Sequence, residues 1–382
     1  MDNLVKKSAL VALTCLPWPW CVYLSAQPTP GSISGNISCA DGNAPARGAD
    51  VELVPIGQLS SGEAATASAH SGLKTTTDFF GTYDLASVEP GVYILNAVMD
   101  GYSDDFALVR YALDRYSAED RKKLLAPFSQ VTIKPGSEAR KDLVLHRGAA
   151  ISGRISVDLG GTPGKIGVTA DLVSSSLLGD SQSGAAANPI SYSRNGIADD
   201  RGYYRIAGLP SGKYRLNITV SESYFEGQVR GDEKAVLVVL APRRPGIAHL
   251  TVFAPDALDQ TAARLYEVKD GDEVPDADIT VPTRFLHSIG GAVTLGGSPT
   301  GEIAVSLRRP DGSGLDSDAI SMSDGSYRFD LLPPGAYTLH AKPASWSSLA
   351  ASRLAGQVSV QLSDTDVLDA NIQLALEPTP QK

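Results

Sequence analysis

The feature that most constrains the fold of this chain is a pattern of glycines and tyrosines that occurs three times. In each copy two glycines lie ten residues apart, and a tyrosine follows each glycine by two residues. The copies are 121 and then 123 residues apart, a domain-sized period that is too long for a solenoid repeat. The signature residues are Gly81, Tyr83, Gly91 and Tyr93, then Gly202, Tyr204, Gly212 and Tyr214, and finally Gly325, Tyr327, Gly335 and Tyr337.

Each copy predicts a β-hairpin. Asp followed closely by Gly supplies a tight turn, because Gly adopts positive φ without steric cost. Apolar and polar residues then alternate, as Tyr204 and Ile206 do around Arg205, which is the pattern of a half-buried strand. A Pro-Gly or Pro-x-Gly element turns the chain back into a second alternating strand. We therefore expect the six tyrosines at core and corner positions rather than as sugar-stacking platforms.

Matching strands flank each hairpin, giving around seven short strands per copy, the count for a small sandwich. Opening strands are expected at 34–37, 151–155 and 289–293, second strands at 49–53 and 303–307, and closing strands at 131–133, 142–145, 235–240, 250–252, 358–360 and 370–374. The predicted fold class is all-β, with three tandem antiparallel β-sandwich modules. Ser117, Asp120 and Pro127 mark the start and stop of one short helix over 117–125, which we expect to decorate the first module.

The N-terminus is typical of an export signal. Lys6 and Lys7 precede an apolar run over 9–16, and small residues follow at Ser25 and Ala26. We predict a signal over 1–26, modules over 27–148, 149–284 and 285–376, and a disordered tail over 377–382; an uncleaved membrane anchor is the alternative. Removing the signal, with Cys15 and Cys21, leaves only Cys39, so no internal disulfide is expected.

Charge and motifs narrow the function. The 43 acidic residues exceed the 33 lysines and arginines, and a net charge of −10 opposes a phosphate backbone, which argues against nucleic-acid binding. The five histidines lack metal-ligand spacing, and Gly-x-Ser-x-Gly, P-loop and dinucleotide motifs are absent. We predict no enzyme activity and no cofactor. One acidic segment could offer oxygen ligands to calcium, but it lacks the spacing of an EF-hand, so we interpret it as a solvated loop. Its residues are Asp270, Asp272, Glu273, Asp276 and Asp278.

The order of these motifs resembles the carboxypeptidase regulatory-like domain, a transthyretin-like sandwich, and is similar to the carbohydrate-binding-like fold of starch-binding modules. The resemblance covers nearly all of residues 28–376. It implies a domain found beside metallocarboxypeptidase catalytic domains, in surface proteins and in outer-membrane transporters. The matched residues are turn and core positions, so the resemblance implies a fold more than a function. It is carried by Ser34-Gly35-Asn36-Ile37, Thr77-Asp78 with Gly81 and Tyr83, and Leu209-Pro210-Ser211-Gly212-Lys213-Tyr214.

Three functions stay open at this point. The first is an exported non-catalytic scaffold of bacterial envelope type, in the periplasm, on the cell surface or secreted, whose loops and sheet edges meet an envelope protein or polysaccharide. The second is a carbohydrate-binding protein, and the third is an accessory domain of a carboxypeptidase system. Oligomeric state is left open. For the second function the candidate contacts are aromatic residues outside the repeat that we expect to be exposed: Tyr102, Tyr192, Tyr224, Phe225 and Trp346, with Tyr111 and Tyr116.

Overall fold

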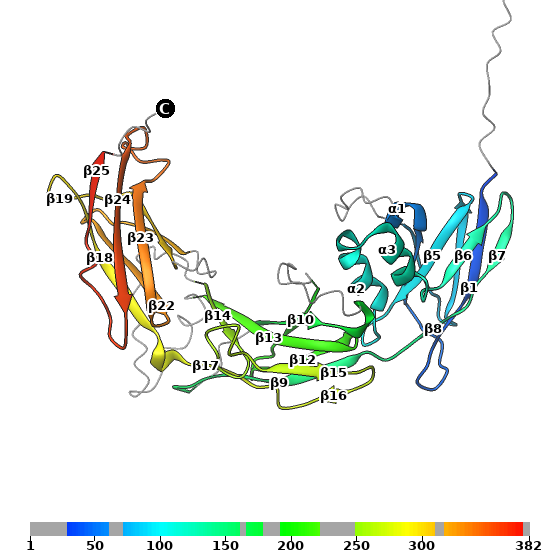
Figure 1. Cartoon of the computed structure of the whole chain (residues 1–382). Coiled ribbons are helices and arrows are strands. Elements are labelled where there is room, and N and C mark those ends of the chain that lie inside the picture. The colour runs from blue at the N-terminus through cyan, green and yellow to red at the C-terminus, as the bar shows by residue number, and fades with distance from the viewer. Residues whose placement is uncertain are drawn as a thin grey trace, which may run out of the picture.

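A computed structural model describes residues 29–60, 72–160, 166–178, 192–221, 249–309 and 317–376. Within these residues the chain forms three β-sandwiches, one after another (Figure 1). The predicted signal, the strand expected at 235–240, Tyr224, Phe225 and the tail over 377–382 lie outside the described residues.

The first sandwich packs two four-stranded sheets around a buried core that includes Ile33, Ile37 and Tyr83. Inward residues alternate with more exposed ones along the opening strand, as the period-two pattern predicts. One sheet holds β4 (Thr82–Val88), β1 (Gly31–Cys39), β7 (Glu138–Arg140) and β8 (Leu143–Leu145), and the other holds β3 (Leu73–Thr76), β2 (Asp50–Pro55), β5 (Gly91–Val98) and β6 (Gln130–Ile133).

The second sandwich repeats this plan. Its smaller sheet holds β12 (Tyr203–Leu209), β9 (Ala149–Val157), β16 (Glu273–Val274) and β17 (Ile279–Val281). Its larger sheet holds β11 (Ser193–Ile197), β10 (Gly167–Ser174), β13 (Gly212–Ser221), β14 (His249–Phe253) and β15 (Leu265–Val268). A short 3₁₀ turn, η2 (Ser176–Leu178), follows β10.

In the third sandwich the two sheets are joined along one side, because β24 pairs with both β23 and β25. Its strands are β18 (His287–Leu295), β19 (Ser298–Pro299), β20 (Ile303–Arg308), β21 (Ser317–Ile320), β22 (Ser326–Leu332), β23 (Gly335–Pro343), β24 (Leu354–Leu362) and β25 (Ile372–Leu376).

Strand pairing follows one rule in all three sandwiches. The opening strand pairs antiparallel with the first hairpin strand and parallel with the last strands, while the other named pairs are antiparallel. The all-β fold of three tandem sandwiches is therefore confirmed, with parallel pairing between the opening strand and the last strands of each unit.

The predicted helix is confirmed as α3 (Ala118–Leu125), where Ser117 Oγ accepts a hydrogen bond from the Asp120 amide at 3.2 Å. Three further helical elements were not predicted from the sequence: α1 (Ile56–Ser60), α2 (Asp105–Ala112) and the 3₁₀ turn η1 (Leu113–Arg115). The start of α2 is set by Asp104, whose carboxylate accepts from the Ala107 amide at 3.0 Å. Among the described residues, no helix has the length and apolarity needed to cross a bilayer.

The helical insert does more than decorate the first sandwich. Its buried residues, among them Phe106, Leu108 and Val109, belong to the same apolar cluster as the core of the second sandwich. The Tyr116 hydroxyl also donates to the Leu178 carbonyl in η2 at 2.8 Å. The insert lies where the first and second sandwiches meet (Figure 1). The two sandwiches therefore share a continuous core through these helices.

A bulge with a left-handed residue recurs in the first hairpin strand of every sandwich. Ser87, Gly208 and Leu331 have φ values of 57°, 74° and 59°, and the pairing register shifts beside each. In the later two sandwiches this bulge touches the module before it. A Cβ on Gly208 would lie 2.9 Å from the Tyr102 carbonyl, and Leu331 packs against the second core.

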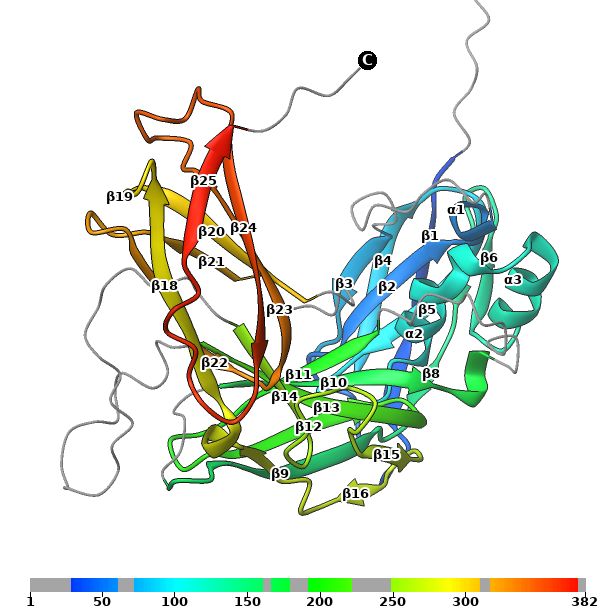
Figure 2. The same cartoon turned by 60° about the vertical axis from the view of Figure 1, so that its left-hand side comes forward.

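The connections between sandwiches are short. β8 ends at Leu145 and β9 begins at Ala149, while β17 and β18 are linked through η5 (Thr283–Phe285). The Asp158 carboxylate fixes the second connection, accepting from the Thr283 amide at 3.0 Å and pairing with Arg284 at 3.1 Å. The first and third sandwiches stand at opposite ends of the second and on the same side of it, so the chain forms an open arc (Figures 1 and 2).

Candidate functional site

The six signature tyrosines are buried and hydrogen-bonded inside the fold, so their rings are not available to a ligand. The first tyrosine of each pair donates to a backbone carbonyl next to the last strands: Tyr83 to Lys141 at 2.7 Å, Tyr204 to Ala277, and Tyr327 to Ala370. The second donates to the carbonyl four residues upstream: Tyr93 to Glu89 at 2.7 Å, Tyr214 to Pro210 at 2.8 Å, and Tyr337 to Pro333 at 2.6 Å. Burial raises the pKa of the Tyr204 and Tyr214 phenols.

The glycine of each opening strand lies against the same carbonyl. A Cβ on Gly35, Gly153 or Gly291 would overlap the carbonyl that accepts the tyrosine hydrogen bond. The side chain of the residue after that carbonyl accepts a hydrogen bond from the backbone amide of the residue after the glycine. These bonds are all 2.8 Å long, from Asn36 to Asp142, Arg154 to Asp278, and Ala292 to Asn371. The shared motif is thus a clamp between the first and last strands.

The acidic residues over 270–278 do not converge on one point. All five are exposed, as the interpretation as a solvated loop predicts, although the short strand β16 lies within this segment and Asp278 is part of the clamp. Across the described residues no group of three or more His, Cys, Asp or Glu is placed to hold a metal ion. Three of the acidic residues in this segment each have a partner of their own: Ser211 for Asp270 (2.7 Å), the Lys269 amide for Asp272 (2.8 Å) and Arg205 for Glu273 (2.6 Å).

Two of the aromatic candidates for sugar contact are not exposed. Tyr102 is 7% exposed and Tyr192 is 5% exposed, so our expectation of exposure was wrong for both. The Tyr102 hydroxyl donates to Asp41 at 2.7 Å, and this hydrogen bond lowers the pKa of the Asp41 carboxyl. Arg147 covers the Tyr102 ring, 5.5 Å from its centroid. These contacts place Tyr102 in the joint between the first two sandwiches.

The other aromatic candidates are scattered. Tyr116 is half-buried against η2, as described above. Tyr111 on α2 is 62% exposed and Trp346, in the β23–β24 connection, is 64% exposed. Because they belong to the first and third sandwiches, they do not form a common platform.

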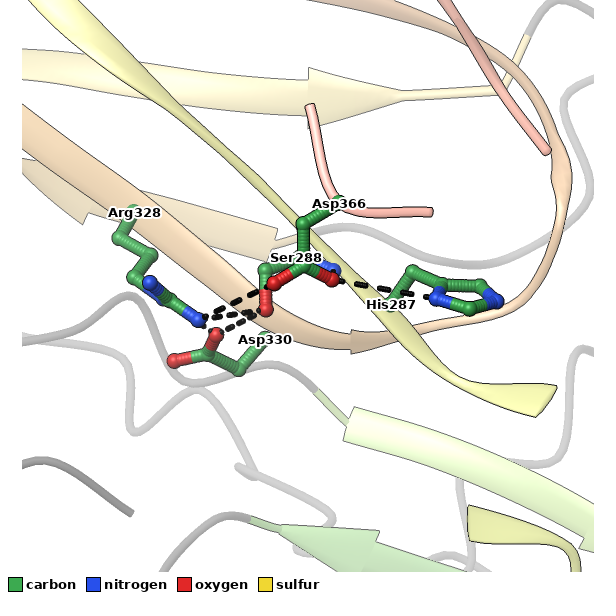
Figure 3. Close-up of polar contacts among 5 residues, drawn as sticks. All are labelled: His287, Ser288, Arg328, Asp330 and Asp366. Atoms are coloured by element: carbon green, nitrogen blue, oxygen red, sulfur yellow. Dashed lines mark hydrogen bonds and ion pairs between the residues drawn. The ribbon is translucent and has the colours of Figure 1, made fainter. Parts of the chain in front are cut away.

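A polar cluster of His287, Ser288, Arg328, Asp330 and Asp366 lies at the start of the third sandwich (Figure 3). The Ser288 hydroxyl donates to Asp330 and accepts from Arg328 at 2.8 Å. Asp366 accepts from the Ser288 amide at 2.9 Å and lies 3.8 Å from His287 Nδ1. Within this cluster the hydroxyl is held by a carboxylate and a guanidinium, so it lacks the imidazole base that activates a serine nucleophile.

The cluster links strands that are distant in the sequence. Arg328 pairs with Asp366 at 3.7 Å, joining β22 to the segment before β25 across the opening strand β18. In the second sandwich Arg205 pairs with Glu273 at 2.6 Å, joining β12 to β16 across β9 in the same way. Spacing in the repeat places Arg328 where the second sandwich has Arg205, but it does not reveal the acidic partners, which lie on distant segments.

A groove of about 600 Å³ with several polar side chains lies on the third sandwich. Its basic side chains are Arg308 on β20 and His340 and Lys342 on β23. Ala355 and Gly356 on β24 and Ala375 on β25 also line it. Leu307 and Leu339 alternate with the basic residues and point into the core, so the groove lies on the outer face of the sheet. The groove is not predictable from local sequence patterns, because its residues come from four strands.

Comparisons with known proteins give no family. No protein-family model matches the sequence, and no curated protein matches it either. Among solved structures, a streptococcal ancillary pilin is 12% identical with a TM-score of 0.28, and the alignment covers 90% of this chain and 98% of the pilin. A minor pilin of Streptococcus agalactiae is 13% identical with a TM-score of 0.31, over 62% of this chain and 99% of the pilin. The TIE protein of Bacillus anthracis is 14% identical with a TM-score of 0.21, over 91% of this chain, which spans about half (51%) of that protein. Similarity at this level carries no functional argument.

Proposed function

We propose that this chain is an exported, non-catalytic scaffold of the cell envelope, in which three sandwiches act as one stiff spacer between binding surfaces. The observation that carries the proposal is the shared core of the first two sandwiches, which is continuous through α2 and α3. A spacer needs joints that resist bending, and buried apolar contact between modules supplies that resistance.

The first joint is also held by backbone hydrogen bonds. The Ser103 amide donates to His146 at 2.9 Å and the Gly148 amide donates to Gly101 at 3.1 Å. Residues of the connection are therefore bonded to the first sandwich, which removes the freedom of a linker. In the second joint Leu331 and Leu286 pack against the second core.

Export is supported by Lys6 and Lys7 before an apolar run, and the regulatory-like resemblance fits modules that recur in surface proteins. Expression of the full chain followed by cell fractionation and intact-mass analysis tests this part. We expect an envelope or secreted species that lacks residues 1–26, and a variant deleted of 1–26 that stays in the cytoplasm. A full-length cytoplasmic product would contradict export.

Stiffness is tested by spin-label distances between Glu138→Cys in the first sandwich and Gln361→Cys in the third, with Cys39→Ser as background. We expect one narrow distance distribution. A flexible Gly/Ser segment inserted after Arg147 should broaden it, whereas the same segment inserted after Asn43, in an exposed turn of the first sandwich, should not. A broad distribution in the parent protein would refute the spacer role.

A further inference from the structure

We propose that copies of this chain associate head to tail, with the Phe79–Phe80 turn of one copy docked into the groove on the third sandwich of the next. This inference goes beyond the spacer role and does not depend on it, because it concerns a contact between two copies in solution. It starts from two aromatic rings that lie in water. Phe79 is 66% exposed and Phe80 is 76% exposed, in the turn between β3 and β4. Aromatic side chains are enriched at the centres of protein–protein interfaces.

The turn does not need these rings in order to fold. The same turn precedes the first hairpin strand of every sandwich, and in it the amides of Gly81, Gly202 and Gly325 each donate to the carbonyl three residues upstream. The two residues between donor and acceptor are exposed in all three turns. They are Asp200-Arg201 in the second sandwich and Ser323-Asp324 in the third, all of them polar. The two rings of the first sandwich therefore have a role other than forming the turn.

The turn holds its rings in a defined arrangement. The Asp78 carboxylate accepts from the amides of Phe80 and Thr82, at 2.8 Å in both cases. The two rings meet edge to face, with their centroids 5.9 Å apart. The Arg47 guanidinium lies 3.9 Å from the centroid of the Phe79 ring. A segment that is ordered in this way before binding loses little conformational entropy when it binds.

The groove on the third sandwich has the size and the lining to accept both rings. A cavity of about 150 Å³ holds benzene, so a groove of about 600 Å³ has room for two phenyl rings. The short residues Ala355 and Ala375, which pair across β24 and β25, line it together with Gly356. The exposed Leu376 adds apolar surface to the lining. The Lys342 ammonium, also in the lining, can contribute a cation–π contact to a docked ring.

The partner that this pair of surfaces selects is a second copy. The first and third sandwiches stand at opposite ends of the second, so the turn and the groove of one chain lie apart (Figures 1 and 2). Each copy would then carry one docking surface at each end. A contact between two different surfaces leaves one of each free after every step, so it produces open chains of copies rather than closed dimers.

A lipid surface fits the turn less well. The chain carries a net charge of −10, so the negative surface of a bilayer with anionic lipids repels it. Attachment to a bilayer through a single small apolar anchor is also marginal. A recess that encloses both rings is the better match.

The contact is small, and this sets its strength. Two aromatic side chains bury about 150–250 Å² each. With the groove surface that they cover, the interface stays below the roughly 1,000 Å² of a stable complex. We therefore expect a dissociation constant on the order of 100 μM. Association then appears only where copies are concentrated.

The experiment is sedimentation velocity of the chain over 27–382 at concentrations between about 10 and 500 μM. The turn variant, Phe79→Asp with Phe80→Arg, copies the Asp200-Arg201 turn of the second sandwich, so the turn should still fold. The groove variant, Ala375→Glu, fills the groove from β25. We expect the sedimentation coefficient of the parent protein to rise with concentration, and each variant to stay monomeric.

Mixing the two variants gives the sharpest test. The turn variant keeps its groove and the groove variant keeps its turn, so an equimolar mixture should form dimers and no longer species. Two controls should associate like the parent protein: Tyr111→Ser, which removes an exposed ring from α2, and Ala336→Glu, which adds the same carboxylate to β23 outside the groove lining. Thermal unfolding of every variant should match that of the parent protein.

Three results would overturn the proposal: a parent protein that is monomeric throughout, association that survives in either variant, or a mixture of the variants that stays monomeric. Flotation with vesicles of phosphatidylethanolamine and phosphatidylglycerol gives the competing outcome. Binding to these vesicles that is lost in the turn variant, with a monomeric parent protein, would assign the turn to a lipid surface instead.

Discussion

The phenol of Tyr83 donates a 2.7 Å hydrogen bond to the backbone carbonyl of Lys141, 58 residues further along the chain. The same bond joins Tyr204 to Ala277 and Tyr327 to Ala370. In each sandwich this bond joins the first hairpin strand to the segment before the last strand, across the opening strand. The contribution of the clamp to stability can therefore be tested in each sandwich.

Replacing Tyr83 by Phe should destabilise the first sandwich by about 1–3 kcal/mol, because the ring stays buried while the Lys141 carbonyl loses its donor. Hydrogen exchange of peptides covering β1 and β8 measures the effect. Tyr111→Phe, on an exposed ring, serves as the control and should change nothing. Unchanged exchange in Tyr83→Phe would show that the clamp does not depend on the phenol.

Gly153→Ala should destabilise the second sandwich by about 1–3 kcal/mol, since the added methyl group must displace the Ala277 carbonyl. Gly167→Ala is the matched control, because a Cβ there meets open space at an ordinary φ. Calorimetric unfolding of both variants gives the comparison, and equal melting temperatures would argue against close contact at Gly153.

The carboxyl of Asp105 predicts how folding stability depends on pH. Burial raises the pKa of its carboxyl, as do the charges of Asp270 and Asp104, while Ser103 and His146 act in the opposite direction. A raised folded-state pKa means that this group favours folding at low pH and that its contribution is lost as pH rises through that pKa. The free energy of unfolding of Asp105→Asn, compared with that of the parent protein, should therefore be more favourable at pH 7 than at pH 4.

Asp120 supplies the opposite control for that experiment. The hydrogen bond from Ser117 lowers the pKa of the Asp120 carboxyl, so its contribution is present at neutral pH and is lost as pH falls. Asp120→Asn should cost more stability at pH 7 than at pH 4. Urea unfolding at both pH values measures both variants, and shifts of the same sign would contradict the assignment.

Asp366, in the polar cluster at the start of the third sandwich, both pairs with Arg328 and accepts a hydrogen bond from the Ser288 amide. Two substitutions distinguish these contributions to stability. Asp366→Asn keeps an oxygen for the Ser288 amide and should cost no more than about 1 kcal/mol. Asp366→Ala removes that acceptor and should cost about 1–3 kcal/mol. Hydrogen exchange at β18 checks this, and equal effects of the two variants would assign the stabilisation to charge.

Local pattern made much of the fold predictable. Turn glycines followed by alternating residues marked both hairpin strands, as in β12 and β13, and Ser117 with Asp120 marked α3. The burial of Tyr102 and Tyr192 was not predictable in this way. Each lies outside the repeat, and its environment comes from segments far along the chain, such as Asp41 and Arg147 around Tyr102.

The amino-acid sequence by itself determined where strands begin and turn, because side-chain alternation and the φ preference of glycine act between near neighbours. Tertiary structure alone decided that the helical insert completes the core of the second sandwich and that Arg308, His340, Lys342 and Ala375 share one groove. Those relationships depend on surfaces assembled from distant strands. The packing of apolar area between such surfaces follows their combined shape, which no local pattern contains.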